Sequence, residues 1–126
     1  RAAFEAALAY AQEREAFGKA IFEHQAVAFR LADMATQIEA ARALYLHAAQ
    51  VHDSGAPSLK EAAMAKLFAS DMAEKVASEA LQTFGGYGYL EDFPVAKIFR
   101  DVRVYRIYEG TNDIQKIVIS RSLAEH

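Results

Sequence analysis

Residues 107–115 combine a carboxylate, a glycine and a hydroxyl residue, and this stretch is the best suited to chemistry. Apolar and aromatic residues lead up to Glu109, Gly110 follows it, and Thr111 precedes a run of β-branched apolar residues. Glycine adopts backbone shapes that other residues avoid. Threonine is a common N-cap, so the pattern predicts a new helix over about residues 112–124. Glu109 is therefore expected at a junction between two helices, where a carboxylate removed from water can act as a general base.

Taken alone, a glutamate before a glycine is more often the solvated end of a helix. That interpretation changes when two further stretches are considered with Tyr108-Glu109-Gly110-Thr111. The three follow one another along the chain as Arg14-Glu15-Ala16-Phe17-Gly18-Lys19, then Gln82-Thr83-Phe84-Gly85-Gly86-Tyr87-Gly88-Tyr89, then Tyr108-Glu109-Gly110-Thr111. Together they cover essentially the whole chain and resemble the acyl-CoA dehydrogenase family. The resemblance implies a FAD-dependent α,β-dehydrogenation of acyl-CoA thioesters. Glu109 would take the α-proton while the flavin accepts the β-hydride.

The resemblance also implies a set of binding residues. Tyr108 and Gly110 would border the acyl chain and thioester of the substrate. The residues expected to contact FAD are Arg14, Phe17, Gln25, Gln82, Phe84, Gly85, Gly86, Thr111 and Asp113. Arg14 and the 82–86 stretch would act across a subunit boundary. Ala16 stands where some members carry a hydroxyl residue, and Asp113 where relatives carry glutamine or glutamate, so these two positions depart from the pattern.

Several of these motifs also have a purely structural interpretation. Gly85-Gly86-Tyr87-Gly88 follows a helix instead of a strand, so it predicts a helix C-cap and not a dinucleotide loop, although a bare backbone also admits a ligand. Arg14 at a helix end would ordinarily face solvent, but its guanidinium also suits phosphate. Basic residues recur every three positions at Lys97, Arg100, Arg103 and Arg106. We expect them to form a solvated or intersubunit ridge.

Composition limits the class of protein. A chain of 126 residues with 53% hydrophobic residues and two prolines is expected to form one globular domain. The net charge of −3 gives no footing for nucleic-acid binding. The chain has no cysteine, which excludes disulfides and thiolate metal sites, and its four histidines form no ligand pattern. The sequence contains no run of about eighteen uncharged apolar residues, so it predicts no membrane span.

Apolar periodicity predicts helices over about residues 1–15, 25–52, 59–83, from Pro94 onwards, and 112–124. The second is the clearest, with an apolar seam at Val27, Leu31, Met34, Ile38, Ala41, Tyr45 and Ala48. Ser58 is expected to cap the third helix with Glu61 as its acidic partner. Residues 102–107 alternate like a strand, but the proline start favours helix. The expected fold is all-α, an up-and-down helical bundle.

The resemblance implies partners as well as chemistry: a homo-oligomer, dimer or tetramer, that passes electrons to an electron-transfer flavoprotein in the bacterial cytoplasm or mitochondrial matrix. The uncapped start suggests the C-terminal piece of a longer chain whose N-terminal helical and middle β domains are absent. Two alternatives stay open. One is a non-catalytic helical oligomerisation module or partner subunit, and the other is an acyl-CoA oxidase or a decarboxylating glutaryl-CoA-type relative.

Overall fold

The computed structural model describes residues 1–124, which fold into five α-helices joined by short connections. The helices are α1 (Ala2–Glu13), α2 (Gln25–Asp53), α3 (Leu59–Phe84), α4 (Pro94–Val102) and α5 (Asn112–Ala124). Short 3-10 helices cover Ile21–Glu23, Gly85–Tyr89 and Arg103–Arg106, and two-residue strands β1 (Glu15–Ala16) and β2 (Lys19–Ala20) pair antiparallel. The all-α prediction is confirmed. His126 lies outside the described residues.

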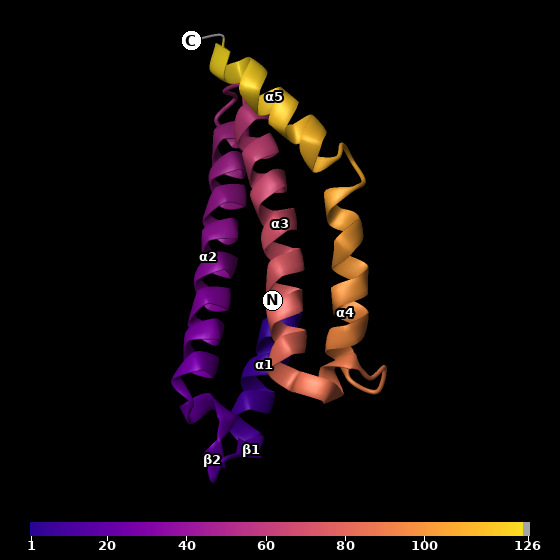
Figure 1. Cartoon of the computed structure of the whole chain (residues 1–126). Coiled ribbons are helices and arrows are strands. Elements are labelled where there is room, and N and C mark those ends of the chain that lie inside the picture. Colours follow the sequence, from indigo (N-terminus) through magenta and orange to yellow (C-terminus); the bar gives the residue numbers. More distant parts are fainter. Residues whose placement is uncertain (125–126) are drawn as a thin grey trace.

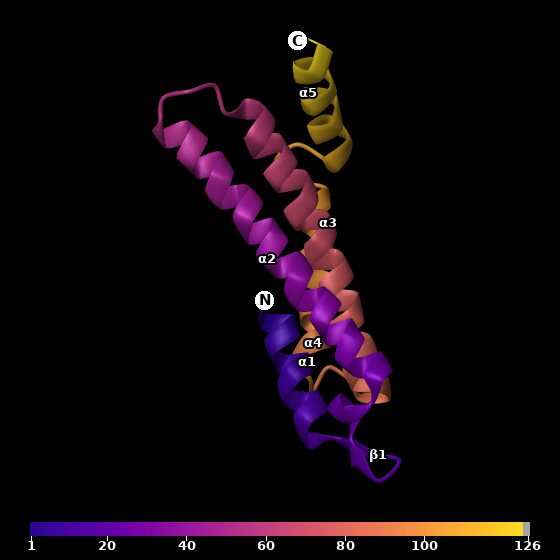
Figure 2. The ribbon, with the colours of Figure 1, turned by 90° about the vertical axis from the view of Figure 1, so that its left-hand side faces the viewer.

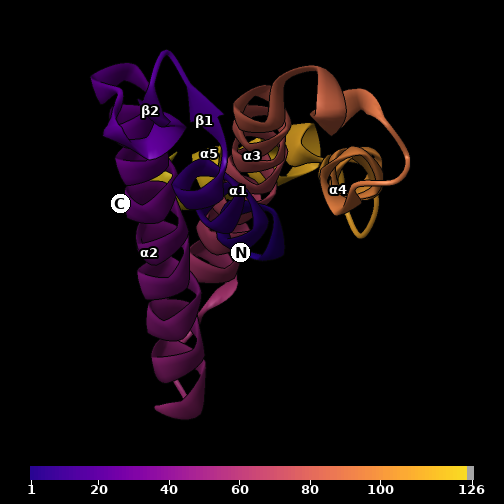
Figure 3. The ribbon, with the colours of Figure 1, turned by 90° about the horizontal axis from the view of Figure 1, so that it is seen from below.

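The long helices α2 and α3 run antiparallel along the molecule, with the β1–β2 hairpin at one end and α5 lying across the other (Figure 1). Helix α3 packs against each of the other four helices. Viewed from the hairpin end, α3 lies between α2 and α4, with α1 against it (Figure 3). Turning the molecule shows α5 on the opposite side of α3 from α2 (Figure 2). Helix α3 is therefore the central helix of the bundle, in contact with every other α-helix.

Small residues allow these helices to approach closely. Ala3, Ala7 and Ala11 form one buried stripe of α1, as the spacing of a helical face requires. Around them lie the larger members of the core: Leu31, Met34, Val76, Phe84 and Val95. Met34 and Val95 are the largest side chains with under 2% exposure. The predicted seam of α2 is confirmed at its buried positions, but Tyr45 is 48% exposed and does not belong to it.

The predicted break at residues 17–19 is a tight hairpin. Glu15 pairs with Ala20 and Ala16 with Lys19, so α1 ends at Glu13 instead of continuing to residue 15. Phe17 and Gly18 supply the turn with φ values of 55° and 81°. The hairpin places Phe17 at the outermost point of this end of the molecule.

Local capping at the other end differs from expectation at one position. Ser58 precedes α3, but its hydroxyl makes no capping hydrogen bond and instead lies 3.3 Å from Nδ1 of His52. Glu61 still serves the helix start, because a hydrogen bond from its own backbone N–H lowers the pKa of its carboxyl group. Within residues 102–107 the predicted helix is found up to Arg106, with Val102 ending α4 and Arg103–Arg106 forming a 3-10 helix, while Ile107 lies in a turn. Across the described residues, no helix combines the length and apolar character needed to span a bilayer.

Candidate functional site

The corner that joins the 3-10 helix Arg103–Arg106 to α5 has an unusual backbone. Glu109 has φ 52° and Gly110 has φ 82°, two consecutive residues in the left-handed region. Within residues 1–124, the residues other than glycine with positive φ are Phe17 and Glu109. Such conformations cost free energy and persist where the surrounding structure imposes them, which is typical of functional sites.

Hydrogen bonds within the corner hold this backbone shape. The Ile114 N–H donates to Oγ1 of Thr111 at 3.3 Å, so the predicted N-cap is present. Nε2 of Gln115 donates to the Gly110 carbonyl at 3.0 Å and approaches the Glu109 carbonyl at 3.4 Å. A Cβ atom at Gly110 would lie 2.8 Å from that Nε2. Glycine is thus favoured here by the backbone angle, and a larger residue would also have to displace the flexible end of the Gln115 side chain.

Glu109 is exposed. Its carboxylate makes no hydrogen bond or ion pair with any other part of residues 1–124. Tyr108 is 47% exposed and stacks on Tyr105 with ring centroids 5.8 Å apart. Asp113 is exposed and lies 3.5 Å from Nζ of Lys116. The corner therefore presents a free carboxylate beside an aromatic surface, and residues of this chain alone leave it in contact with water.

The corner is tied to α3 by one buried amide. Asn112, at 5% exposure, accepts hydrogen bonds at Oδ1 from Nζ of Lys66 at 2.7 Å and from Oγ of Ser70 at 3.0 Å. Its Nδ2 donates to Oδ1 of Asp71 at 2.8 Å. Three of the four hydrogen bonds that a side-chain amide can make are made to α3, and they fix the start of α5 against that helix.

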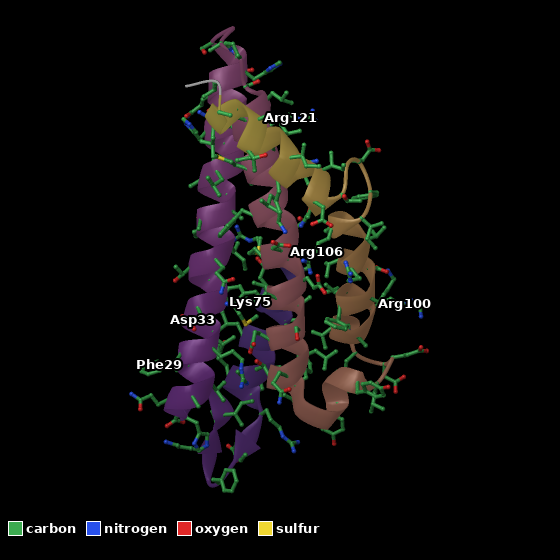
Figure 4. All side chains as sticks on the ribbon, turned by 45° about the horizontal axis from the view of Figure 1, so that its top comes forward. Phe29, Asp33, Lys75, Arg100, Arg106 and Arg121 are labelled. Carbon is green, nitrogen blue, oxygen red and sulfur yellow. The ribbon has the colours of Figure 1, made fainter. Side chains whose placement is uncertain are left out.

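An arginine ties the other side of the corner to the same helix. Nη1 of Arg106 donates to Oε2 of Glu74 at 2.7 Å, and Nε lies 2.7 Å from Oδ1 of Asp71 without alignment for a hydrogen bond. The hydrogen bond that Arg106 donates to Glu74, and then the charge of Asp71, raise the pKa of Arg106. Figure 4 shows Arg106 in the space between α3 and α4, whereas Arg100 points outward from α4. The expected basic ridge is therefore divided, because Arg103 also pairs with Glu74 at 3.6 Å.

A second group of predicted residues gathers at the hairpin end. A surface hollow of about 460 Å³ is lined by Tyr10, Arg14, Ile21, Thr83, Phe84, Gly85, Gly86, Tyr87 and Leu90. It brings together four of the predicted FAD-contacting residues, Arg14 with Phe84, Gly85 and Gly86, although they are far apart in the sequence. The Arg14 guanidinium carbon lies 5.5 Å from the centre of the Tyr87 ring, a cation–π contact that fixes the direction of the charge.

Phe17, Gln25 and Gln82 lie at the same end of the molecule but do not line this hollow, and Thr111 and Asp113 belong to the Glu109 corner. Phe17 is 96% exposed at the hairpin turn, and its ring contacts the His24 ring edge-on at 6.0 Å. Gln25 is exposed at the start of α2, and Gln82 is exposed in the last turn of α3. Phe84 is different, since its ring is buried and stacks on Tyr10 at 4.2 Å. Its side chain belongs to the core, and what reaches the hollow is its backbone and ring edge.

Glycines next to this hollow serve two separate purposes. A Cβ atom at Gly88 would lie 2.4 Å from the Leu81 carbonyl oxygen, so internal packing demands glycine there. Gly85 has φ 61° and ends α3 as a C-cap, as predicted. Gly86 has neither a positive φ nor any atom within 4 Å of the Cβ position. The chain's own packing does not explain Gly86, which leaves its backbone free for an approach from outside.

The two groups of candidate residues lie at opposite ends of the molecule (Figures 1 and 2). Ser70 marks the α3 turn beside the Glu109 corner, and Gly85 marks the hollow. The helical rise between these two positions is about 22 Å. Sequence reasoning assigned members of both groups to one ligand, and the structure brings each group together internally but not with the other.

Sequence reasoning missed the residues that hold the corner. Asn112 was treated only as the start of a helix, although it is the most deeply buried residue of the corner. The signal was present in α3, where Lys66, Ser70 and Asp71 place three polar side chains on one helical face at spacings of four and five. Polar residues at core spacing require a buried partner, and a partner 41 to 46 residues away leaves no local pattern.

Comparison with known proteins identifies relatives along the whole described chain. The family model described as "Acyl-CoA dehydrogenase, C-terminal domain" matches residues 1–124. An acyl-CoA dehydrogenase of Bacillus subtilis is 53% identical over 122 residues, which is 97% of this chain and 32% of that protein. The CarC subunit of the caffeyl-CoA reductase-Etf complex of Acetobacterium woodii is 46% identical over 121 residues, 96% of this chain and 32% of that protein.

A solved structure agrees with these sequence relatives. Butyryl-CoA dehydrogenase from Megasphaera elsdenii superposes with a TM-score of 0.96 at 47% identity. The match covers 98% of this chain and 32% of that one. The chain therefore spans about a third of the length of the proteins it matches.

Proposed function

The chain belongs to the acyl-CoA dehydrogenase family, and we propose that it is the C-terminal helical domain of a longer FAD-dependent enzyme that α,β-dehydrogenates acyl-CoA thioesters. The observation that carries this proposal is the left-handed corner at Glu109 and Gly110. It presents one unpaired carboxylate at a helix junction, and no packing need of the chain calls for a carboxylate there. A purely structural module would have no use for it, which favours the enzyme over the oligomerisation module.

Glu109 is the proposed base. Its carboxylate accepts the proton from the carbon next to the thioester carbonyl, while the neighbouring Tyr108 and Gly110 border the acyl chain. The α-proton is only weakly acidic, so the carboxylate must be shielded from water to be effective. Glu109 is exposed among residues 1–124. We therefore assign that shielding to the bound substrate and to segments equivalent to the parts of the relatives that this chain does not match.

The hairpin-end residues suit the phosphates of a dinucleotide. The guanidinium of Arg14, directed by Tyr87, matches an anionic group, and the open backbone at Gly85 and Gly86 admits close approach. FAD, when bound, supplies the hydride acceptor. Thr111 and Asp113 at the far corner complete the proposed set for the flavin, with Phe17, Gln25 and Gln82 around the hollow.

The separation of the two groups supports a site shared between two protomers. The Glu109 corner of one chain would face the hollow of another, so that a homodimer is the smallest complete unit and a tetramer would contain two such dimers. We propose an electron-transfer flavoprotein as the electron acceptor, in keeping with the Etf complex to which the Acetobacterium relative belongs.

Replacing the proposed base tests the function directly. In the full-length protein, Glu109→Gln keeps the side-chain size and removes the basic oxygen. Acyl-CoA-dependent flavin bleaching and α-proton exchange are expected to fall by about 10²–10⁴-fold, with the flavin content per protomer unchanged. Stopped-flow absorbance measures the bleaching. Glu39→Gln, at an exposed carboxylate on α2, is the matched control and should behave as wild type. Bleaching at the wild-type rate in Glu109→Gln would remove Glu109 from this role.

The same preparation separates the alternatives within and beyond the family. A substrate panel with no bleaching by any acyl-CoA would support the non-catalytic module. Oxygen consumption without an added acceptor would indicate an oxidase, and carbon dioxide release from glutaryl-CoA a decarboxylating relative. Reduction of an electron-transfer flavoprotein would support the dehydrogenase.

A further inference from the structure

Both sides of the Glu109 corner are attached to one carboxylate. Oδ1 of Asp71 accepts the hydrogen bond from Nδ2 of Asn112 at 2.8 Å and lies 2.7 Å from Nε of Arg106. Arg106 ends the 3-10 helix before the corner, and Asn112 begins α5 after it. The intervening residues 107–111 therefore form a short bridge whose two ends meet at the same atom of α3.

This attachment supplies what the strained backbone needs. Consecutive left-handed residues persist only where their surroundings impose the conformation. Gln115 and Thr111 restrain the corner from within, but their bonds would move with α5 if that helix shifted. Asp71 is mounted on α3, the helix that packs against all the others, so it provides a fixed reference outside the corner.

Charge balance reinforces the arrangement. Lys66 places its ammonium 2.7 Å from Oδ1 of Asn112, and Glu74 binds Nη1 of Arg106 at 2.7 Å. Each cation that approaches the corner thus has a partner, and the amide of Asn112 is oriented by a donor on one side and an acceptor on the other. Exchanging the two ends of that amide would place a donor against Lys66 and Ser70 and an acceptor against Asp71.

We propose that Asp71 is a positioning residue for the base, acting through Asn112 and Arg106 to fix where the Glu109 carboxylate stands. This inference rests on the proposed function, since it gives Glu109 a reaction to serve. Asp71 itself touches neither Glu109 nor any residue expected to meet the flavin. Its effect is confined to the geometry of residues 107–111.

A reciprocal exchange provides the test. In the full-length protein, Asp71→Asn and Asn112→Asp are made singly and together. Asp71→Asn keeps an oxygen that can accept from Nδ2 of Asn112 but removes the charge beside Nε of Arg106. Asn112→Asp removes the donor and sets two carboxylates against each other. The double variant restores a donor at position 71 and an acceptor at position 112, where Lys66 and Ser70 still donate, and leaves the net charge unchanged. We expect each single variant to lower the rate of α-proton exchange per bound flavin by about 10²-fold, the scale of an ångström-sized misplacement. The double variant should recover the part of that loss that arises at Asn112, while the part that arises from the lost carboxylate beside Arg106 remains.

The measurements distinguish positioning from simple stability. Flavin content and the KM for acyl-CoA should stay near wild type in the single variants, with the loss in kcat. Ser70→Ala, which removes one donor to Asn112 and is the milder change, should give a smaller loss of the same kind. Glu79→Gln is the control, because Glu79 lies on α3 like Asp71 but forms its 2.9 Å ion pair with Arg30 of α2, away from the corner. That variant should keep the wild-type rate.

Two results would overturn the proposal, and they differ from failure of the function itself. Wild-type exchange rates per bound flavin in Asp71→Asn, Asn112→Asp and Ser70→Ala, with Glu109→Gln inactive, would reject positioning and leave the base in place. A loss that merely follows the folded or flavin-loaded fraction would also reject it. If Glu109→Gln retained wild-type exchange, the proposed function would fail and the positioning role with it.

Discussion

At the scale of single residues, the glycines at the hairpin end show how one residue type serves different needs within four positions. Gly88 is fixed by contact with the backbone of α3, Gly85 by its backbone angle, and Gly86 by neither. A side chain at Gly86 would therefore project into the space that we assign to the flavin. The internal demands of the fold and the demands of a ligand can thus be separated by substitution.

Gly88→Ala and Gly86→Ala should have opposite effects. The added methyl at position 88 meets the Leu81 carbonyl oxygen, so we expect a loss of about 1–3 kcal/mol in the free energy of unfolding. At position 86, stability should be unchanged or higher by up to about 1 kcal/mol, while flavin binding weakens. Urea unfolding of the 126-residue chain, followed by helical circular dichroism, measures the first effect. Flavin retained by the full-length protein after gel filtration measures the second. Equal stabilities for the two variants would contradict the packing argument.

At the scale of elements, the core of the bundle consists mostly of alanine, so its stability depends on a few large buried side chains. Met34 is 1% exposed between α1, α2 and α3, whereas Tyr45, three turns further along the same predicted seam, is 48% exposed. Helix α1 is shorter than α2 and covers only its first half (Figure 2). Ala41 and Ala48 of the same seam are still buried at 3% and 8%, so the seam continues to pack along α2 and it is the larger Tyr45 side chain that reaches solvent.

Met34→Ala and Tyr45→Ala test this difference on one helix. Met34→Ala leaves a cavity in the core and should lower the free energy of unfolding by about 2–5 kcal/mol. Tyr45→Ala should cost less than about 1 kcal/mol in the 126-residue chain, since half of its side chain is already in water. Urea midpoints at unchanged m-value report both. A cost for Tyr45→Ala as large as that for Met34→Ala would place Tyr45 in the core after all.

What could be predicted from the sequence depended on how far apart in the sequence the interacting residues lie. Thr111, Gly85 and Pro94 act on their own turn of helix, so their roles were predicted correctly from neighbouring residues. The Ser58 capping bond was wrong, because a tertiary neighbour, His52, occupies the hydroxyl. Asn112 was missed because its partners lie more than forty positions away. The exposure of Tyr45 was missed because apolar periodicity does not show how much of a large side chain the neighbouring helices cover. Roles set by neighbouring residues could be predicted from the sequence, and contacts between distant segments could not.

At the scale of the whole molecule, the separation of the Arg14 hollow from the Glu109 corner is the feature with the largest consequence. Both groups are exposed, they face opposite ends of α3, and the helical rise between them is about 22 Å. If each flavin needs both groups, then each must come from a different protomer. The isolated 126-residue chain is accordingly expected to bind FAD weakly and not to turn over, which equilibrium dialysis against FAD would measure.

Mixing two inactive variants of the full-length protein tests the shared site. Arg14→Ala should lose flavin, and Glu109→Gln should keep it but lose the base, so neither homo-oligomer oxidises acyl-CoA. In a hybrid, the unaltered Glu109 of the first chain faces the unaltered Arg14 of the second, and one complete site forms per pair. Dissociating and reassembling an equal mixture should restore about a quarter of the wild-type rate per protomer, as random pairing requires.

A matched mixture controls for assembly. Glu109→Gln combined with the double variant Arg14→Ala/Glu109→Gln forms hybrids of the same kind but contains no intact base, so its rate should stay at the background. Different affinity tags on the two chains verify that hybrids have formed. Hybrids that form fully in the first mixture yet restore no activity would mean that both groups serve the same protomer. In that case the flavin would have to reach along α3, and the two-protomer site would be wrong.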